Sequence, residues 1–338
     1  MSQLLRVRGV TPLVVLMLLP LLASPRQQSQ PPSQKPEDVV ETLKIEVSVV
    51  NLFFNVKDGR GALVPSLTRD DFRVFEEGAE QKIKYFTAET NQPLTLGILI
   101  DTSGSQQRVL NMEQEVGAAF LREVLREKKD LAFLISFDIS VDLLQDFTDS
   151  PRLLRRALER TKINTGTGGG GPPGLGGGPF PAGRPRGTLL YDAVYLAARE
   201  KLAREIGRKA VIILTDGQDQ GSQMHIQDAI ESAQKADAIC YVLLIEDRGF
   251  YGGFYSGDRA MRKLAEETGG RVIDVGRSEK KLREAFDQIA AELRSQYSIG
   301  YTSINSKRDG GFRRVEVRPV RSGLKVQARL GYYAQQAP

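Results

Sequence analysis

The sequence predicts an α/β protein, in which a doubly wound and mostly parallel sheet is inserted in a small β-sandwich formed by the N- and C-terminal flanks. Two observations lead to this prediction. Between residues 92 and 296, apolar runs of strand length alternate with helical segments, which is the pattern of a parallel sheet with helices on both faces. On either side of this region the chain has only short strand-like segments and turns, which are typical of antiparallel sheets.

The first segment of the chain has the pattern of a secretory signal peptide. Arg6 and Arg8 precede an apolar core at residues 12–22, and small residues follow that core. We therefore expect a signal peptide over residues 1–24, a periplasmic or extracellular location, and no membrane insertion of the mature chain. An uncleaved N-terminal anchor is the alternative. Residues 25–38 are rich in Pro, Gln and Ser and are expected to form a linker.

The two flanks, residues 39–91 and 297–334, are expected to form one discontinuous β-sandwich. Neither flank has enough strands to bury its own apolar face, so pairing between the flanks is the economical solution. The strand-like segments are Leu43–Phe54, Phe72–Gly78, Gln81–Phe86, Tyr297–Thr302, Phe312–Val320 and Leu324–Tyr333.

The central region, residues 92–296, is expected to alternate strands and helices. The predicted strands are Leu94–Ile100, Leu131–Phe137, Val141–Phe147, Ala210–Thr215, Ile239–Ile245 and Arg271–Val275. The predicted helices are Val109–Glu127, Pro151–Arg160, Leu189–Ile206, Met224–Ala236, Asp258–Thr268 and Glu279–Arg294. Only a short turn separates the second strand from the third, which indicates an antiparallel edge strand. A Gly- and Pro-rich insertion occupies residues 165–187.

Oxygen-bearing side chains lie where two predicted strands end and where one predicted helix begins. Asp101, Ser103 and Ser105 follow the first strand, Thr188 precedes a helix, and Asp216 follows another strand. The C-terminal ends of parallel strands meet at one edge of the sheet, where such folds bind ligands. Hard oxygen ligands suit Mg²⁺, Ca²⁺ or Mn²⁺. The alternative is that the three hydroxyl residues act only in turns and helix caps.

The order Asp-x-Ser-x-Ser, then a distant Thr, then a distant Asp, resembles the metal-ion-dependent adhesion site (MIDAS) of von Willebrand factor A (VWFA) domains, which have a Rossmann-like fold. The resemblance maps onto Asp101, Ser103, Ser105, Thr188 and Asp216. It implies a bound divalent ion, Mg²⁺ or else Ca²⁺ or Mn²⁺. It also implies that an acidic side chain of a partner protein completes the coordination of the ion.

The flanks are similar to those of exported VWFA-related proteins of acidobacteria. The segments that carry this resemblance are Phe72–Glu76, Gln81–Ile83, Tyr297–Tyr301 and Gly331–Tyr333. We therefore expect an exported protein, not an enzyme, that binds an unidentified protein presenting an exposed Asp or Glu. A metal-dependent hydrolase and a metal-independent structural or assembly module are the alternatives.

Other features of the sequence narrow the choice of function. The net charge of +5 is too small to indicate nucleic-acid binding. His225 is the sole histidine and Cys240 the sole cysteine, so a zinc site of the usual His/Cys type is not expected. Asp192 could bind a water of the metal site or serve as a first-turn acid of its helix, and Asp138 is a weaker candidate at the rim of the site.

Overall fold

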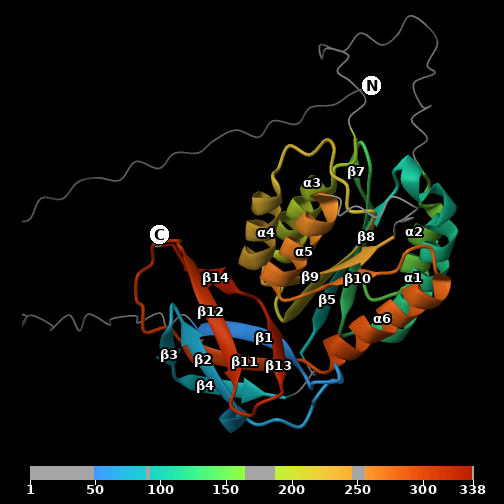
Figure 1. Cartoon of the computed structure of the whole chain (residues 1–338). Coiled ribbons are helices and arrows are strands. Elements are labelled where there is room, and N and C mark those ends of the chain that lie inside the picture. Colours follow the sequence, from blue (N-terminus) through green and yellow to red (C-terminus); the bar gives the residue numbers. More distant parts are fainter. Residues whose placement is uncertain (1–48, 89–91, 164–186, 246–255, 337–338) are drawn as a thin grey trace, which may run out of the picture. The chain divides into compact units, whose positions relative to one another are not determined.

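The computed structural model describes residues 49–88, 92–163, 187–245 and 256–336 (Figure 1). The predicted signal peptide, the linker and all but the last residue of the 165–187 insertion lie outside the described residues. Among the helices that are described, none is both long and apolar enough to cross a bilayer.

A six-stranded sheet forms the centre of the α/β region, in the order β10-β9-β8-β5-β6-β7. Its strands are β10 Val272–Asp274, β9 Ala238–Leu244, β8 Arg208–Thr215, β5 Leu94–Asp101, β6 Leu131–Phe137 and β7 Val141–Thr148. All neighbouring strands are parallel except β7, which pairs antiparallel with β6 at the edge of the sheet. Every residue of β5, β8 and β9 is buried, as expected for strands that are covered on both faces.

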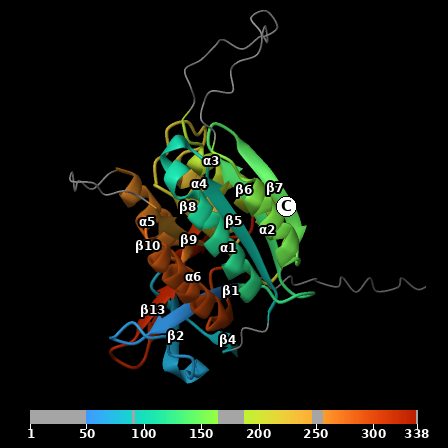
Figure 2. The ribbon, with the colours of Figure 1, turned by 90° about the vertical axis from the view of Figure 1, so that its right-hand side faces the viewer.

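Helices cover both faces of this sheet, as Figures 1 and 2 show. The helices are α1 Leu110–Val124, α2 Pro151–Arg160, α3 Leu190–Leu196, α4 Ile226–Lys235, α5 Ser256–Thr268 and α6 Glu279–Arg294. Helices α1, α2 and α6 pack with Ile98 and Ile100 of β5 on one face, whereas α3, α4 and α5 pack with Leu99 on the other. This division follows from the alternation of side chains along a strand.

The flanks form two four-stranded antiparallel sheets, in the orders β13-β1-β11-β4 and β14-β12-β2-β3. Their strands are β1 Val49–Lys57, β2 Phe72–Glu76, β3 Ala79–Gln81, β4 Ile83–Thr87, β11 Tyr297–Thr302, β12 Phe312–Pro319, β13 Lys325–Ala328 and β14 Gly331–Tyr333. Each sheet combines strands of both flanks, since β1 pairs with β11 and β2 pairs with β12. The predicted sandwich is therefore confirmed.

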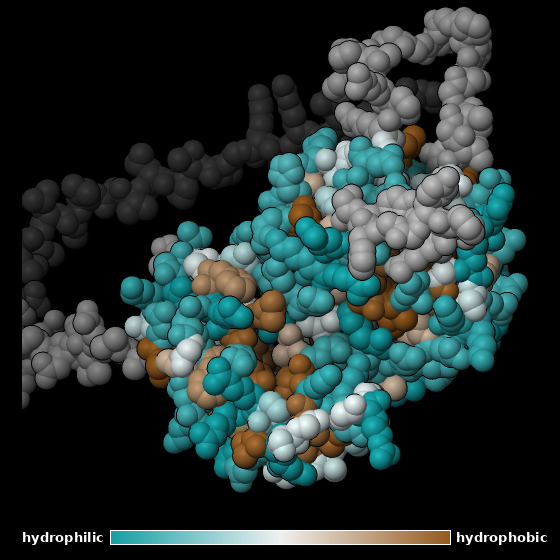
Figure 3. Space-filling model, viewed as in Figure 1, coloured by the Kyte–Doolittle hydropathy of each residue, from teal (hydrophilic) through white to brown (hydrophobic). Residues whose placement is uncertain are grey.

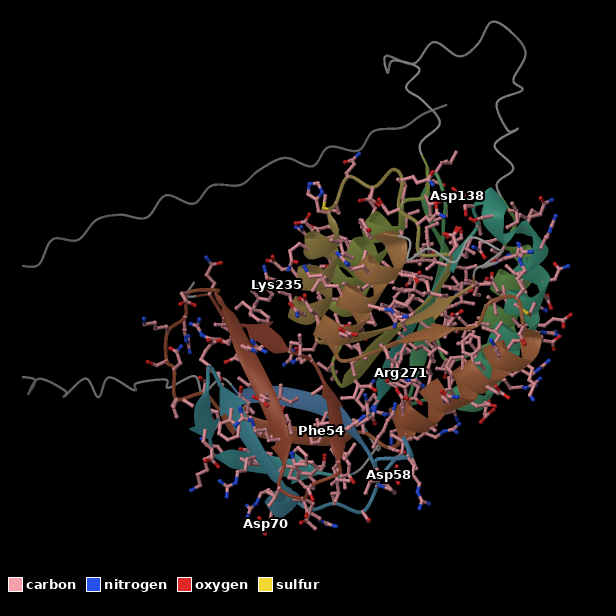
Figure 4. The ribbon with its side chains drawn as sticks, viewed as in Figure 1. Phe54, Asp58, Asp70, Asp138, Lys235 and Arg271 are labelled. Atoms are coloured by element: carbon pink, nitrogen blue, oxygen red, sulfur yellow. The ribbon has the colours of Figure 1, made fainter. Side chains whose placement is uncertain are left out.

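The core of the sandwich contains aromatic side chains from both flanks. The ring centroids of Phe54 and Phe72, in the N-terminal flank, lie 5.5 and 5.6 Å from that of Tyr297 in the C-terminal flank and 5.1 Å from each other. Figure 4 shows Phe54 among these strands. The last strand before the α/β region, β4, pairs with the first strand after it, β11. The chain thus leaves and re-enters the sandwich on neighbouring strands, as an insertion requires.

Polar contacts tie the sandwich to the last helix of the α/β region. The carboxylate of Glu292 in α6 is 2% exposed and accepts hydrogen bonds from Lys57 of β1 and Arg271, each at 2.8 Å. Gln327 of β13 donates to the backbone oxygen of Gly269 at 3.1 Å. On the face shown in Figure 3, the surface is mostly hydrophilic and the hydrophobic side chains form small groups.

Candidate metal centre

Asp101 is the last residue of β5 and its side chain is fully buried. Its Oδ1 accepts a hydrogen bond from the Ser103 N–H at 2.9 Å, and its Oδ2 accepts one from the Thr215 hydroxyl at 2.8 Å. Thr215 is the last residue of β8, and its Oγ1 in turn accepts the Gly217 N–H at 3.0 Å. The carboxylate is therefore fixed between the ends of two neighbouring parallel strands.

Ser103 and Ser105 lie on the solvent side of this carboxylate. Their Oγ atoms are 2.9 Å apart, and Ser105 is exposed whereas Ser103 is partly buried. Ser103 precedes the 3₁₀-helix η2, Gly104–Arg108, but its side chain makes no capping hydrogen bond. A role restricted to helix capping therefore does not account for the Ser103 hydroxyl, which points toward Ser105 instead.

Thr188 is buried just before α3, with 8% of its surface exposed. Two backbone hydrogen bonds hold its segment: the N–H of Leu189 donates to the carbonyl of Asp138 at 2.7 Å, and the N–H of Gln220 donates to the carbonyl of Thr188 at 3.1 Å. Thr188 is thus held between the end of β6 and the loop that follows β8.

Asp138 braces the site. Its carboxylate accepts the Thr102 hydroxyl at 3.0 Å and the Ser140 N–H at 3.0 Å, while its carbonyl accepts the Leu189 N–H. Figure 4 shows Asp138 at one end of the α/β region. This residue joins the loop after β5, the end of β6 and the start of α3.

Asp216 follows directly on Thr215 and is partly exposed. Its Oδ1 accepts the Gln218 N–H at 3.0 Å. The next residue, Gly217, has φ +84°, a left-handed conformation that favours glycine and lets the chain turn sharply after the carboxylate. Burial raises the pKa of Asp101 to about 6, the hydrogen bonds from Ser103 oppose this rise, and the charge of Asp216 adds to it. The two carboxylates are therefore electrostatic neighbours.

The structure brings the five predicted residues to one edge of the sheet; their assignment as metal ligands stays a prediction. The donor set fits a hard divalent cation, because two carboxylates balance its charge and three hydroxyls add neutral oxygens. A cation would also offset the cost of ionising the buried Asp101 beside Asp216. No group of three or more His, Cys, Asp or Glu side chains suited to a metal occurs in the described part of the chain. Ion binding here would thus depend on the hydroxyls.

The sequence did not indicate two hydroxyl residues that hold the site, and it left the role of Asp192 open. Thr102 and Thr215 lie inside the motif segments, but only the fold shows that their hydroxyls bind Asp138 and Asp101. Asp192 lies in the first turn of α3, as one of its two predicted roles requires, and its carboxylate accepts the backbone N–H groups of Gln223 and Met224 at 2.8 to 3.1 Å. It braces the loop after β8.

The sole histidine and the sole cysteine lie in separate elements of the α/β region. His225 is an exposed residue at the N-cap of α4. Cys240 is fully buried in β9, and burial raises the pKa of its thiol to about 12. The thiol is therefore uncharged at neutral pH.

Two features together define the fold: the strand order with one antiparallel edge strand, and the Asp-x-Ser-x-Ser loop at the end of a central strand. The chain has a VWFA-like fold. No family model and no curated protein sequence matches it.

Solved structures of similar fold were found at low sequence identity. Proximal thread matrix protein 1 from the mussel byssus, with a zinc-occupied MIDAS motif, is 13% identical over 65% of this chain and 50% of its own, with a TM-score of 0.48. BatB from Bacteroides thetaiotaomicron is 16% identical over 60% of this chain and 100% of its own, with a TM-score of 0.45. An aerotolerance-related membrane protein from Bacteroides fragilis is 19% identical over 59% of this chain and 98% of its own, with a TM-score of 0.43. This chain spans about half the length of the mussel protein.

Proposed function

We propose that this protein binds a partner protein through a divalent ion at the VWFA-like site. Asp101, Ser103, Ser105, Thr188 and Asp216 would hold the ion, and an acidic side chain of the partner would complete its coordination. The observation that carries the proposal is the pairing of a buried, oriented carboxylate with two outer hydroxyls 2.9 Å apart. This arrangement leaves the solvent side of the site open to a ligand from another molecule.

The chemistry of the residues favours Mg²⁺, with Ca²⁺ or Mn²⁺ as alternatives, because every proposed ligand atom is a hard oxygen. When bound, the ion supplies a positive centre that attracts a carboxylate. The protein's own contribution is orientation: Ser103 and Thr215 fix the Asp101 carboxylate, and Asp138 ties the loop after β5 to the segment of Thr188.

Binding is a better proposal than hydrolysis because of how the nearby carboxylates are engaged. A hydrolase needs a general base that is free to accept a proton beside the ion. Asp138 and Asp192 already accept hydrogen bonds that hold the loops of this region. The carboxylate of Glu113 has no hydrogen-bond partner, but it has no exposed surface and so does not reach a water on the solvent side of the site. We also propose export to the bacterial envelope, which rests on the signal-peptide pattern of residues 1–24.

The proposal is tested with a peptide that carries one central glutamate and with its glutamine counterpart. Because a single carboxylate binds weakly, binding is followed by NMR through the amide signals of Gly104 and Ser105. We expect the glutamate peptide to shift these signals in Mg²⁺ but not in EDTA, and the glutamine peptide to leave them unchanged. The variant Asp142→Asn removes an exposed carboxylate at the start of β7 and should respond like wild type. Equal shifts in EDTA, or from both peptides, would contradict the proposal.

A further inference from the structure

A carboxylate that the motif does not include is buried in α1. Glu113 has no exposed surface, and neither of its carboxylate oxygens has a hydrogen-bond partner. Burying such a group without a partner is costly, because the lost hydration of the charge or of the acid is not replaced. Packing alone therefore does not explain a glutamate at this position, because an apolar residue of similar size would cost less to bury.

Glu113 is close to the candidate metal centre. Helix α1 begins five residues after Ser105, and the N–H of Glu113 in its first turn donates to the carbonyl of Val109 at 3.0 Å. The charge of Asp101 adds to the effect of burial in raising the pKa of Glu113 well above its ordinary value. Both side chains are fully buried, so water screens this repulsion only weakly.

A second buried oxygen lies in the same segment. Gln106, which directly follows Ser105, is 1% exposed, and its Oε1 has no hydrogen-bond partner. Its backbone N–H donates to the Ser103 carbonyl at 3.0 Å and its carbonyl accepts the Val109 N–H at 3.0 Å, so its backbone is fixed within η2. Within the eight residues that follow Ser105, one amide oxygen and two carboxylate oxygens are thus buried without partners.

We propose that the buried carboxylate of Glu113 supports the divalent-ion site from inside, behind the ligands and not among them, and that with the amide oxygen of Gln106 it forms the inner wall of the site. The inference rests on the proposed function, because it needs an ion at Asp101. Glu113 is a positioning residue in this account: it raises the affinity for the ion by adding negative charge and acceptor oxygens from inside. The partner's carboxylate would approach from the opposite, solvent side.

The competing explanation is that Glu113 stays protonated and serves only in packing. The isosteric substitution Glu113→Gln separates the two explanations, because it removes the charge and keeps the shape. The matched control is Glu115→Gln, which removes an exposed carboxylate two residues further along the same helix. Affinity for Mg²⁺ and Mn²⁺ is measured by calorimetry, and thermal unfolding is followed with EDTA and with each ion.

We expect Glu113→Gln to weaken ion binding by 10- to 100-fold, the range typical of residues that support metal ligands, and to reduce the stabilisation that the ion produces. Unfolding in EDTA should occur at the same temperature as in wild type or at a higher one, which shows that the variant is folded; the lost ion affinity is the effect that a role in packing alone would not give. Glu115→Gln should change the affinity less than twofold. Wild-type affinity in Glu113→Gln would overturn the inference and leave the proposed function intact, whereas wild type that binds no ion would overturn the proposed function.

A second variant decides the question if Glu113→Gln does not fold. Gln106→Met keeps the length of the side chain and removes the unpartnered amide oxygen. We expect it to weaken Mg²⁺ binding several-fold with little change in unfolding temperature in EDTA. An unchanged affinity for Mg²⁺ in this variant would contradict the proposal that Gln106 forms part of the inner wall of the site.

Discussion

At the residue scale, the state of Asp101 connects the fold to ion binding. Burial raises its pKa to about 6 from an ordinary value of 3.8. The folded state therefore retains a proton that the unfolded chain loses, and the stability present below about pH 4 decreases as the pH rises toward 6. A rise of about two pH units corresponds to about 3 kcal/mol. A bound cation removes this penalty because it favours the ionised carboxylate.

The first prediction is that Asp101→Asn stabilises the ion-free protein at neutral pH. We expect a gain of about 1–3 kcal/mol in the free energy of unfolding at pH 7.5 in EDTA, because the substitution removes a buried charge. The loss of some charge-assisted hydrogen bonding keeps the gain in this range. The gain should shrink toward pH 4, where Asp101 is protonated. Urea unfolding at both pH values measures it. A variant that is less stable than wild type at pH 7.5 in EDTA would show that the buried charge of Asp101 does not destabilise the ion-free protein.

The sequence alone indicates the oxygen-bearing loop after β5, but it does not indicate the buried residues that support this loop. Asp101, Ser103 and Ser105 could be predicted because their spacing after an apolar run is unusual. Glu113 could not, since a glutamate in an amphipathic helix normally faces water and only packing shows that this one is fully buried. Thr102 and Thr215 were likewise hidden, because a hydroxyl next to a motif residue has many possible partners before the chain is folded.

At the element scale, the strands of the α/β region were predicted more accurately than those of the flanks. The predicted strand Leu324–Tyr333 is two strands, β13 and β14, in different sheets, and the predicted strand Gln81–Phe86 is divided between β3 and β4. The apolar runs that became β5, β8 and β9 are buried on both faces, so composition alone marks them. The predicted helix Leu189–Ile206 differs from the structure: α3 ends at Leu196, and a π-helical turn, η3, covers Ala197–Leu202. The buried residues Ala197, Ala198 and Leu202 keep an apolar face through this turn, so the hydrophobic pattern does not reveal the change in hydrogen bonding.

A buried carboxylate joins the strands of the two flanks at this scale. Glu76 of β2 is 2% exposed and accepts hydroxyl groups from Tyr301 of β11 at 2.9 Å, Ser303 at 2.6 Å and Tyr332 of β14 at 3.1 Å. One side chain of the N-terminal flank thus holds two strands of the C-terminal flank, β11 and β14, together with the segment that follows β11.

We predict that Glu76→Ala lowers the free energy of unfolding by about 2–4 kcal/mol, because three hydroxyls lose a charged acceptor and two of them lie on half- or fully buried tyrosines. The control is Glu80→Ala on β3, whose exposed carboxylate is 3.9 Å from Arg73 and should contribute less than about 1 kcal/mol. Chemical denaturation measures both variants. Equal stability of the two variants would mean that the Glu76 network does not hold the sandwich together.

At the scale of the whole molecule, the chain is a discontinuous sandwich around an inserted α/β region. Both sandwich sheets need strands from both ends of the sequence. We therefore predict that deletion of residues 297–338 exposes residues 49–87 to proteolysis, while residues 93–296 remain a resistant fragment. Limited trypsin digestion followed by mass spectrometry tests this. An N-terminal flank that stays resistant after the deletion would contradict shared folding.

The general architecture could be predicted because its signals are local: alternation of strands and helices, and short strands at the two ends. The contacts between the sandwich and the α/β region could not be predicted. Glu292 of α6 accepts hydrogen bonds from Lys57 and Arg271, and no local pattern in the sequence links residues so far apart. The candidate ion site could be predicted in part. The proposed ligands occur in three distant segments whose order resembles a known motif, and only the fold shows that these segments lie at one edge of the sheet.

The central claim is that the loop after β5 holds a divalent ion, and calorimetric titration of Mg²⁺ into the EDTA-dialysed protein tests it most directly. Wild type should bind one ion per chain, with modest affinity in the absence of a partner because Mg²⁺ dehydrates reluctantly. Asp101→Ala, which removes the central carboxylate, should give no binding heat while its circular dichroism spectrum stays that of wild type. Unchanged binding in Asp101→Ala, or no binding of Mg²⁺, Mn²⁺ or Ca²⁺ by wild type, would contradict the account.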